Sequence, residues 1–267
     1  MKKLIILFLS IFCFLNGCVI AKEKILMIND TPGIYIFKID TKKYGEKIKP
    51  YITQNLTVPS KVYEENCFDL VVNAGFFDVK TGKSVSYVTI DNEMVADVEE
   101  NTALTESLKK ENRLEYVLQR GELRILQKGE ELKFDIALHN APIEEGYTLK
   151  HALQAGPILF PNMDLVKEGF VIYDENCNVK FQAADILKRR ERTAIALKGK
   201  YLYIVIFTKE NKVDVHEMAT FMKKTLKAKK ALAFDGGLST AINYKNISIG
   251  SLGKQQRRVK SFLVIER

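Results

Sequence analysis

The stretch ALAFDGGLSTA, at residues 231–241, carries the clearest structural signal in the chain. Its apolar start predicts a short buried strand, and the glycine pair at 236–237 predicts where that strand ends. Two glycines allow backbone angles and close approaches that other residues resist. Asp235, Ser239 and Thr240 surround this break. The segment therefore predicts either a polar site at a strand end or an ordinary turn, in which Asp and Gly are also common.

Length and composition predict one globular domain. The chain has 267 residues, of which 46% are hydrophobic and 28% are charged, a balance typical of globular proteins. It has no internal repeat, no low-complexity tract and no linker rich in Pro, Gly or Ser. We therefore expect a single domain over residues 22–267, after a leader at 1–21.

The leader has the pattern of a secretory signal peptide. Residues 1–3 are Met-Lys-Lys, and residues 4–15 are almost entirely apolar but too few to span a membrane. The sequence Val-Ile-Ala at 19–21 fits cleavage before residue 22. Leu-Asn-Gly-Cys at 15–18 instead resembles a bacterial lipobox, with cleavage before Cys18 and a lipid on that cysteine. Both alternatives predict an exported protein that is periplasmic, secreted or on the cell surface.

The cysteines could form one disulfide, and the cysteines and histidines lack the spacing of a zinc site. Cys67 and Cys177 follow the leader, and two thiols in an exported protein either form a bridge or stay as separate buried thiols. His139, His151 and His216 are scattered without the spacing of a metal site. We therefore expect no zinc site and no cofactor, and the sequence leaves open whether an activity depends on a metal.

The charge balance favours an anionic partner. The formal net charge is +8 and falls to about +6 when Lys2 and Lys3 leave with the leader. Basic surfaces attract nucleic acid, lipid headgroups or phosphorylated glycans, although many lysines simply keep a surface solvated. Export argues against nucleic acid. Contact with a membrane is expected only through a lipid on Cys18.

Strand patterns outnumber helical ones along the chain. The segments at 192–197 and 201–207 flank Lys-Gly-Lys and predict a hairpin, and the second lacks polar alternation, as in a central strand. Residues 213–230 form the best helical pattern, in which Asp214 and Glu217 predict a capping box. Further strands are expected at 33–40, 69–72, 122–127, 133–138, 231–234 and 261–265, with strand-like pieces within 86–98. Residues 151–160 form an apolar run with a Gly-Pro break. The sequence predicts an α+β fold built on a mixed, largely antiparallel β-sheet with a few flanking helices.

Three other segments place polar side chains beside strand ends. NAGFFD at 73–78 contains an amide and a carboxylate, although its two phenylalanines also fit a turn over the core. QAGP at 154–157 combines an amide with a backbone break. Arg192 opens the first strand of the predicted hairpin, and a guanidinium held by a sheet suits bidentate phosphate recognition.

These segments together resemble a known family. In order, NAGFFD, QAGPILF, ERTAIAL, VHEMATFM, ALAFDGGLSTAI and SFLVIE are similar to the phosphodiester glycosidase domain family, from about residue 71 to the C-terminus. This is the family of the enzyme that uncovers mannose 6-phosphate by removing N-acetylglucosamine. The chain departs from the family pattern at Ala74, Ala196 and Phe234, and none of these departures removes a polar group.

The resemblance implies an exported hydrolase that cleaves a sugar-1-phosphodiester into a sugar and a phosphomonoester. Two other functions stay open: a non-catalytic protein that binds phosphorylated glycans, and a lipoprotein of envelope assembly. Asp235 is the first candidate for the catalytic carboxylate, followed by Asp78 and by Glu217, which the capping box also explains. The candidates for holding the phosphate are Arg192 and the backbone N–H groups of Gly236 and Gly237, and those for orienting the sugar hydroxyls are Asn73, Gln154 and Ser239. The other candidates for substrate binding are Gly75, Gly156, Thr193 and Thr240.

Overall fold

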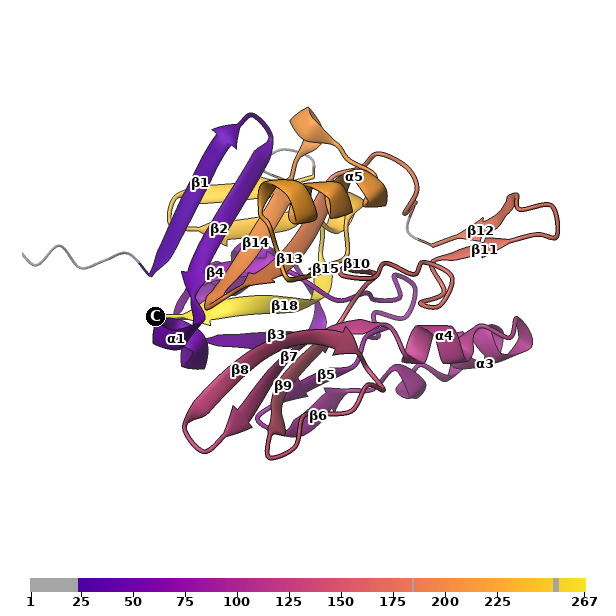
Figure 1. The fold of residues 1–267 in the computed structure, drawn as a ribbon, viewed down its shortest axis with the longest axis horizontal. Helices are drawn as coiled ribbons and strands as arrows, with labels where there is room; N and C mark the ends of the chain where they lie inside the picture. The colour runs from indigo at the N-terminus through magenta and orange to yellow at the C-terminus, as the bar shows by residue number, and fades with distance from the viewer. Residues whose placement is uncertain (1–23, 184, 252–254) are drawn as a thin grey trace, which may run out of the picture.

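The computed structural model describes residues 24–183, 185–251 and 255–267, so the expected leader and Cys18 lie outside the described residues. Strands dominate, and they form three antiparallel sheets and one separate hairpin (Figure 1). Every pairing within these sheets is antiparallel. The α+β class is confirmed, and the strands divide among several sheets.

The first sheet contains the predicted hairpin at its centre. Its order is β1-β2-β14-β13-β15-β10. Its strands are β1 (Ile25–Thr31), β2 (Ile34–Asp40), β10 (Ile158–Phe160), β13 (Arg192–Lys198), β14 (Tyr201–Phe207) and β15 (Lys230–Ala233). Residues 201–207 pair on both sides, so the prediction of a central strand is confirmed.

The other two sheets have five strands each. The second has the order β17-β16-β4-β18-β3, and the third has the order β6-β5-β9-β7-β8. The second contains β3 (Ile48–Thr57), β4 (Phe68–Asn73), β16 (Ala241–Tyr244), β17 (Ile247–Gly250) and β18 (Val259–Glu266). The third contains β5 (Val88–Ile90), β6 (Glu93–Ala96), β7 (Gly121–Lys128), β8 (Glu131–Leu138) and β9 (Thr148–Gln154).

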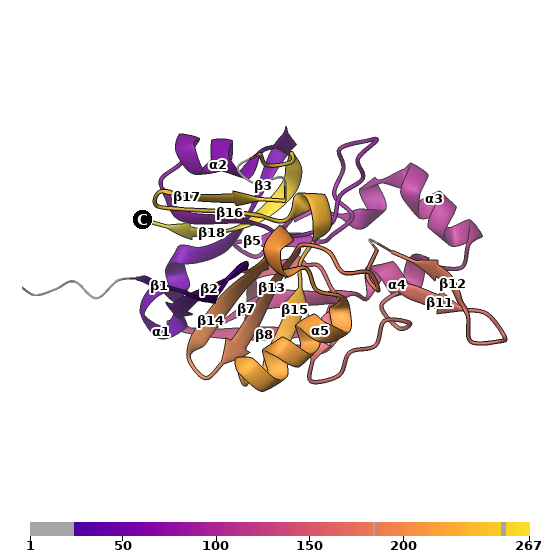
Figure 2. The same ribbon diagram turned by 90° about the horizontal axis from the view of Figure 1, so that it is seen from above.

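Helices cover the outer faces and project from one side. The helices are α1 (Thr41–Tyr44), α2 (Pro59–Glu65), α3 (Thr102–Lys110), α4 (Leu114–Leu118) and α5 (Val215–Thr220). Seen from above, α2 and α5 lie on opposite sides of the molecule (Figure 2). The hairpin of β11 (Val171–Tyr173) and β12 (Val179–Gln182) projects from the same side as α3 and α4 (Figure 1).

Alternation along the strands divides the core. Successive side chains of a strand point to opposite faces, so Ala194 and Val205 pack with Met218 of α5, whereas Ile195 and Ile204 face inward. The inward cluster also receives residues from the second and third sheets. One continuous core therefore joins all three sheets.

The helix expected at 213–230 ends earlier than predicted. The helix α5 continues as a π-helix over Phe221–Thr225, and Lys227 then takes a left-handed conformation with φ of +53°. The N–H of Lys229 donates to the carbonyl of Leu197, so the chain has already joined the first sheet. The capping box is confirmed: the Asp214 carboxylate accepts from the N–H of Glu217, whose carboxylate accepts from the N–H of Asp214.

Both cysteine alternatives are wrong. Cys67 and Cys177 are free thiols, and both are exposed rather than bridged or buried. Within the described ranges, no group of three His, Cys, Asp or Glu side chains is arranged to hold a metal ion. In the same part of the chain, no helix has both the length and the apolar character needed to cross a membrane.

Candidate active site

Asp235 lies where the chain crosses from the first sheet to the second. The strand β15 ends at Ala233, and β16 begins at Ala241. The N–H of Asp235 donates to the carbonyl of Ala74, just beyond β4, at 2.8 Å. The N–H of Gly237 donates to the carbonyl of Glu191, just before β13, also at 2.8 Å. The crossing is therefore held against both sheets.

The two glycines at this crossing are required by the geometry. A Cβ on Gly236 would lie 3.1 Å from the Glu191 carbonyl oxygen and 3.2 Å from Cδ of Arg192. Gly237 has φ of +57°, and nothing lies within 4 Å of where its Cβ would be. The strand-end break is thus confirmed. The backbone at Gly237 is open to an approaching molecule.

The glycine N–H groups do not form the phosphate cradle that the sequence suggested. The N–H of Gly237 is already bonded to Glu191, as described above. The N–H of Gly236 is directed to the carboxylate of Asp235, whose charged form it favours. Neither N–H is therefore free for a phosphate.

The Asp235 carboxyl is the most perturbed acid at this crossing. Burial raises its pKa to about 6, while a hydrogen bond from Ser239 and the charge of Arg257 oppose that rise. The charge of Arg192 acts in the same direction but more weakly. A carboxyl with such a pKa changes protonation close to neutral pH, which suits acid–base chemistry.

Asn73 positions the crossing. Its side chain is fully buried, and its Nδ2 donates to the carbonyl of Asp235 at 2.6 Å. Its Oδ1 accepts from the hydroxyl of Thr193 at 2.8 Å and from the N–H of Ala241 at 3.0 Å. Because Asn73 and Thr193 are buried and bonded to each other, they hold Asp235 in place and do not reach a sugar. The expectation that they bind substrate is corrected accordingly.

Arg192 is also engaged by the protein. Its Nη2 donates to the carbonyls of Asp185, Ile186 and Lys188 at 2.7–3.2 Å, and its Nε donates to the carbonyl of Val213. This guanidinium therefore holds the loop before β13, and burial lowers its pKa. It contributes positive charge near Asp235 but does not offer the free fork expected for phosphate.

The side chain of Gln154 is bonded to backbone outside the crossing. Its side chain is fully buried, with Nε2 donating to the carbonyls of Leu118 at 2.8 Å and Val117 at 3.3 Å. Its Oε1 accepts from the N–H of Tyr87 at 3.3 Å. These bonds join β9 to α4, so the expected contact with a sugar is replaced by a structural role.

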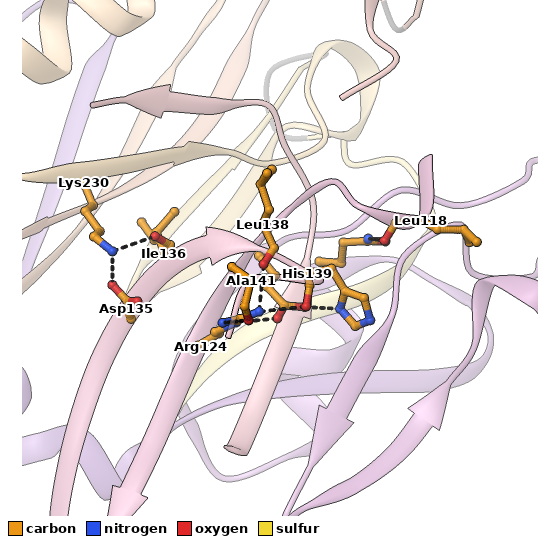
Figure 3. Close-up of polar contacts among 10 residues, drawn as sticks. Leu118, Arg124, Asp135, Ile136, Leu138, His139, Ala141 and Lys230 are labelled. Atoms are coloured by element: carbon orange, nitrogen blue, oxygen red, sulfur yellow. Dashed lines mark hydrogen bonds and ion pairs between the residues drawn. The ribbon is translucent and has the colours of Figure 1, made fainter. Parts of the chain in front are cut away.

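A buried ionic network lies in the third sheet (Figure 3). Arg124 donates to the carboxylate of Glu122 at 2.7 Å and to the carbonyls of Leu138, His139 and Ala141. His139 Nδ1 lies 2.7 Å from the other oxygen of Glu122. Because the Glu122 carboxylate and the Arg124 guanidinium satisfy each other, the network stabilises the sheet.

Gly75 and Gly156 are close-approach positions. A Cβ on Gly75 would lie 2.8 Å from Cβ and Oγ of Ser86, and the N–H of Gly75 donates to Ser261. Gly156 has φ of +111°, and a Cβ there would lie 2.8 Å from a carboxylate oxygen of Glu168. Both glycines are needed for packing around the site, and neither N–H is open to substrate.

The two other candidate carboxylates organise local backbone. Asp78 accepts from the N–H of Lys80 at 2.8 Å and from the hydroxyl of Thr81 at 2.9 Å, and these bonds hold its pKa below the ordinary value. Glu217 closes the capping box and lies 3.2 Å from Nε of Arg189. We therefore leave both out of the proposed catalytic group.

The hydroxyls after the glycines are buried beside Asp235. The side chain of Ser239 is hydrogen-bonded to the Asp235 carboxylate. The Thr240 Oγ1 is buried and has no hydrogen-bond partner in the part of the chain that the structure describes. An unsatisfied buried hydroxyl is costly, so it marks a position where a ligand or water would gain a bond.

Sequence reasoning missed Arg257. Its charge favours the ionised form of Asp235, and its Cζ lies 5.4 Å from the ring centre of Phe77 in the NAGFFD segment. Arg257 belongs to a short basic run before β18. Such runs are common on solvated surfaces, so the sequence offered no means of distinguishing this arginine from its neighbours.

The fold is shared with solved structures at low sequence identity. The zebrafish N-acetylglucosamine-1-phosphodiester alpha-N-acetylglucosaminidase catalytic domain, auto-inhibited by its pro-peptide, has a TM-score of 0.62 at 14% identity, over 91% of this chain and 81% of that one. A hypothetical protein from Synechocystis has a TM-score of 0.58 at 14% identity, over 91% and 61% of the two chains. A protein assigned as exported in Burkholderia pseudomallei K96243 has a TM-score of 0.53 at 12% identity, over 88% and 74%.

No curated protein matches the chain. The family profile of phosphodiester glycosidases matches residues 66–266, which is well over half of the sequence and includes both Asn73 and Asp235. This match confirms the resemblance carried by the ordered motifs. The chain belongs to the phosphodiester glycosidase family.

Proposed function

We propose that this protein is an exported hydrolase that cleaves sugar-1-phosphodiesters, with phosphorylated surface or extracellular glycans as its substrates. The observation that carries the proposal is Asp235, a carboxyl with a pKa raised to about 6 beside an open glycine backbone. Membership of a glycosidase family supports a reaction at the anomeric carbon.

Hydrolysis of a sugar-1-phosphodiester requires one carboxylate at the anomeric carbon. In the overall reaction, water adds across the bond between the anomeric carbon and the phosphate oxygen, giving a free sugar and a phosphomonoester. A carboxylate assists by taking a proton from water or by stabilising positive charge at the anomeric carbon. A phosphate leaving group needs little protonation. Asp235 therefore serves without a second acid, and Ser239 and Asn73 hold it in position.

Export is part of the proposal. It is supported by the basic start and apolar run of residues 1–21, and a structurally similar protein of Burkholderia pseudomallei is itself assigned as exported. The mass of the mature N-terminus tests it. A chain beginning at Lys22 indicates simple cleavage, a diacylglyceryl mass on Cys18 indicates a lipoprotein, and an intact Met1 contradicts export.

Sugar release tests the activity. The substrates are hexose and N-acetylhexosamine 1-phosphates esterified with methanol, and the variants are Asp235→Asn and the control Asp91→Asn. Asp91 is exposed and has φ of +50°, a conformation that Asn accepts readily. We expect Asp235→Asn to lose at least a hundredfold in kcat with its fold intact, and the control to retain full activity.

Two results would overturn the proposal. Turnover by Asp235→Asn at the original rate would remove Asp235 from the chemistry. Binding of the diesters without any sugar release would instead favour a non-catalytic protein that binds phosphorylated glycans.

A further inference from the structure

Arg120 is a buried arginine with unused donors. Its side chain is only 6% exposed, and its Cζ lies 4.2 Å from the ring centre of Phe170 and 5.2 Å from that of Phe76. Its Nε donates to the carbonyl of Glu168 at 3.1 Å. Within residues 24–183, 185–251 and 255–267, Nη1 and Nη2 of Arg120 donate no hydrogen bond. Two of the strongest donors in the protein are therefore available to a ligand.

Arg120 and Arg113 pack on the same β11–β12 hairpin: Arg120 on Phe170, whose carbonyl accepts from the N–H of Ala183, and Arg113 on Phe181, two residues before Ala183. Arg113 also has an unused donor. Its Cζ lies 3.6 Å from the ring centre of Phe181, and its Nη1 donates to Glu111 at 2.6 Å. Its Nε is buried without a partner in the described part of the chain. The pKa of Arg120 falls to about 10, mainly because of burial; the charge of Glu168 opposes that fall and the charge of Arg113 adds to it. With that pKa, Arg120 stays cationic at neutral pH.

This arginine pair adjoins Asp235 through the NAGFFD segment. Phe76, which packs against Arg120, lies two residues after Ala74, whose carbonyl accepts from the N–H of Asp235. Arg113 directly precedes α4, and its partner Phe181 belongs to β12. The contact between Arg113 and Phe181 joins two projecting parts of the molecule, the α3–α4 segment and the β11–β12 hairpin, which lie on the same side (Figure 1). Arg120 is therefore linked to the crossing that carries Asp235 through residues 74–76.

We propose that Arg113 and Arg120 form an anion site that holds the phosphate group of the substrate. The identity of the substrate rests on the proposed function, whereas the anion site rests on the two arginines themselves. Guanidinium groups match phosphate oxygens in a planar, bidentate geometry, and aromatic surroundings strengthen such contacts by excluding water.

The nearby carboxylates do not occupy this site. Glu168 directs its carboxylate oxygens to the N–H groups of Gly121 and Ile158, at 2.7 and 2.8 Å. Glu111 takes only Nη1 of Arg113. Cation–π packing explains why the rings lie against the guanidiniums. It does not explain why two arginines on one hairpin keep unused N–H groups, whereas an anion bound by both does.

Binding of inorganic phosphate tests the site directly. The purified protein is titrated with phosphate by calorimetry, as the original chain and as Arg120→Gln, Arg113→Gln and the control Arg189→Gln. Arg189 is an exposed arginine paired with Glu217. We expect each of the first two substitutions to weaken phosphate binding at least tenfold and the control to leave it unchanged. Equal affinity in all four proteins would overturn the site.

A second variant and a hydrolysis assay cover the case in which Arg120→Gln does not fold and distinguish the anion site from the hydrolase activity. If Arg120→Gln fails to fold, Arg113→Gln decides the outcome alone, because in the described part of the chain Arg113 donates one hydrogen bond, to the half-exposed Glu111. Diester hydrolysis separates the two proposals. Phosphate binding that depends on both arginines, without sugar release, would sustain the site and contradict the hydrolase. Sugar release with an unchanged KM in both variants would contradict the site and sustain the hydrolase.

Discussion

Asp235 carries a charge at a position where burial opposes it. Its carboxyl is bonded to Ser239, while Arg192 and Arg257 lower the cost of its ionised form only in part. Active sites commonly retain such destabilised groups because the chemistry needs them. The functional interpretation of Asp235 therefore has a consequence for stability as well as for rate.

We expect Asp235→Asn to stabilise the protein above pH 6. The pKa rises from an ordinary 3.8 to about 6 on folding, so the folded state binds more protons than the unfolded state between these values. The free energy of unfolding of the original protein therefore falls as pH rises through this window, by up to about 3 kcal/mol at about 1.4 kcal/mol per unit. The Asn variant has no carboxyl at this position, so its free energy of unfolding does not fall for this reason.

Urea unfolding at pH 4, 6 and 8 measures the effect. The two proteins should be similar at the lowest pH and should diverge as pH rises, with the Asn variant the more stable. A constant difference across the three pH values would contradict the raised pKa. The same carboxyl predicts that kcat rises with pH through about 6 and then levels off, if the ionised form is the active one.

We expect Asn73→Ala to destabilise the fold strongly. The substitution leaves the Asp235 carbonyl, the Ala241 N–H and the Thr193 hydroxyl without their partner. Each unsatisfied buried group costs about 1–3 kcal/mol, so the loss should exceed about 3 kcal/mol. Thermal unfolding measures it. The exposed control Asn162→Ala should change stability by less than about 0.5 kcal/mol. A stable Asn73→Ala protein with only a raised KM would restore the direct role in binding.

At the residue scale, the sequence indicated the right neighbourhood but not the roles. The segments containing Asn73, Arg192 and Asp235 do meet, as their polar strand ends suggested. Whether an amide reaches a ligand or a distant carbonyl depends on partners more than a hundred residues away. No local pattern specifies those partners. The same reason explains why Arg113, Arg120 and Arg257 were missed.

At the scale of elements, the role of Glu217 in capping α5 can be tested separately from a role in catalysis. We expect Glu217→Ala to lower stability by about 0.5–1 kcal/mol, because it removes half of the capping box, and to leave kcat and KM unchanged. Thermal unfolding and sugar release measure the two effects. A folded variant with at least tenfold lower kcat would show that Glu217 takes part in the reaction after all.

Element types were predictable where the pattern was local. The hairpin of β13 and β14 and the N-terminus of α5 follow from alternation and capping, which nearby residues determine. The C-terminal end of α5 does not, because the lysine-rich residues 226–230 favour a helix locally while pairing of β15 with β13 draws them into a sheet. The division into three sheets likewise depends on pairing between distant segments.

At the scale of the whole molecule, one core makes the three sheets a single unit. Ile39 of the first sheet, Leu70 of the second and Leu153 of the third belong to the same buried cluster, and none is measurably exposed. A domain with a shared core unfolds cooperatively. The crossing that carries Asp235 depends on this coupling, because it connects two of the sheets.

We therefore expect Leu153→Ala to lower the stability of the entire protein. Deleting a fully buried leucine costs about 3 kcal/mol through lost burial and the remaining cavity. Calorimetry should show one transition, shifted to lower temperature, and tryptic cleavage should accelerate in all three sheets together. The exposed control Leu26→Ala should leave the transition nearly unchanged. Two separate transitions, with the first and second sheets retaining their original stability, would show that the third sheet folds as its own unit.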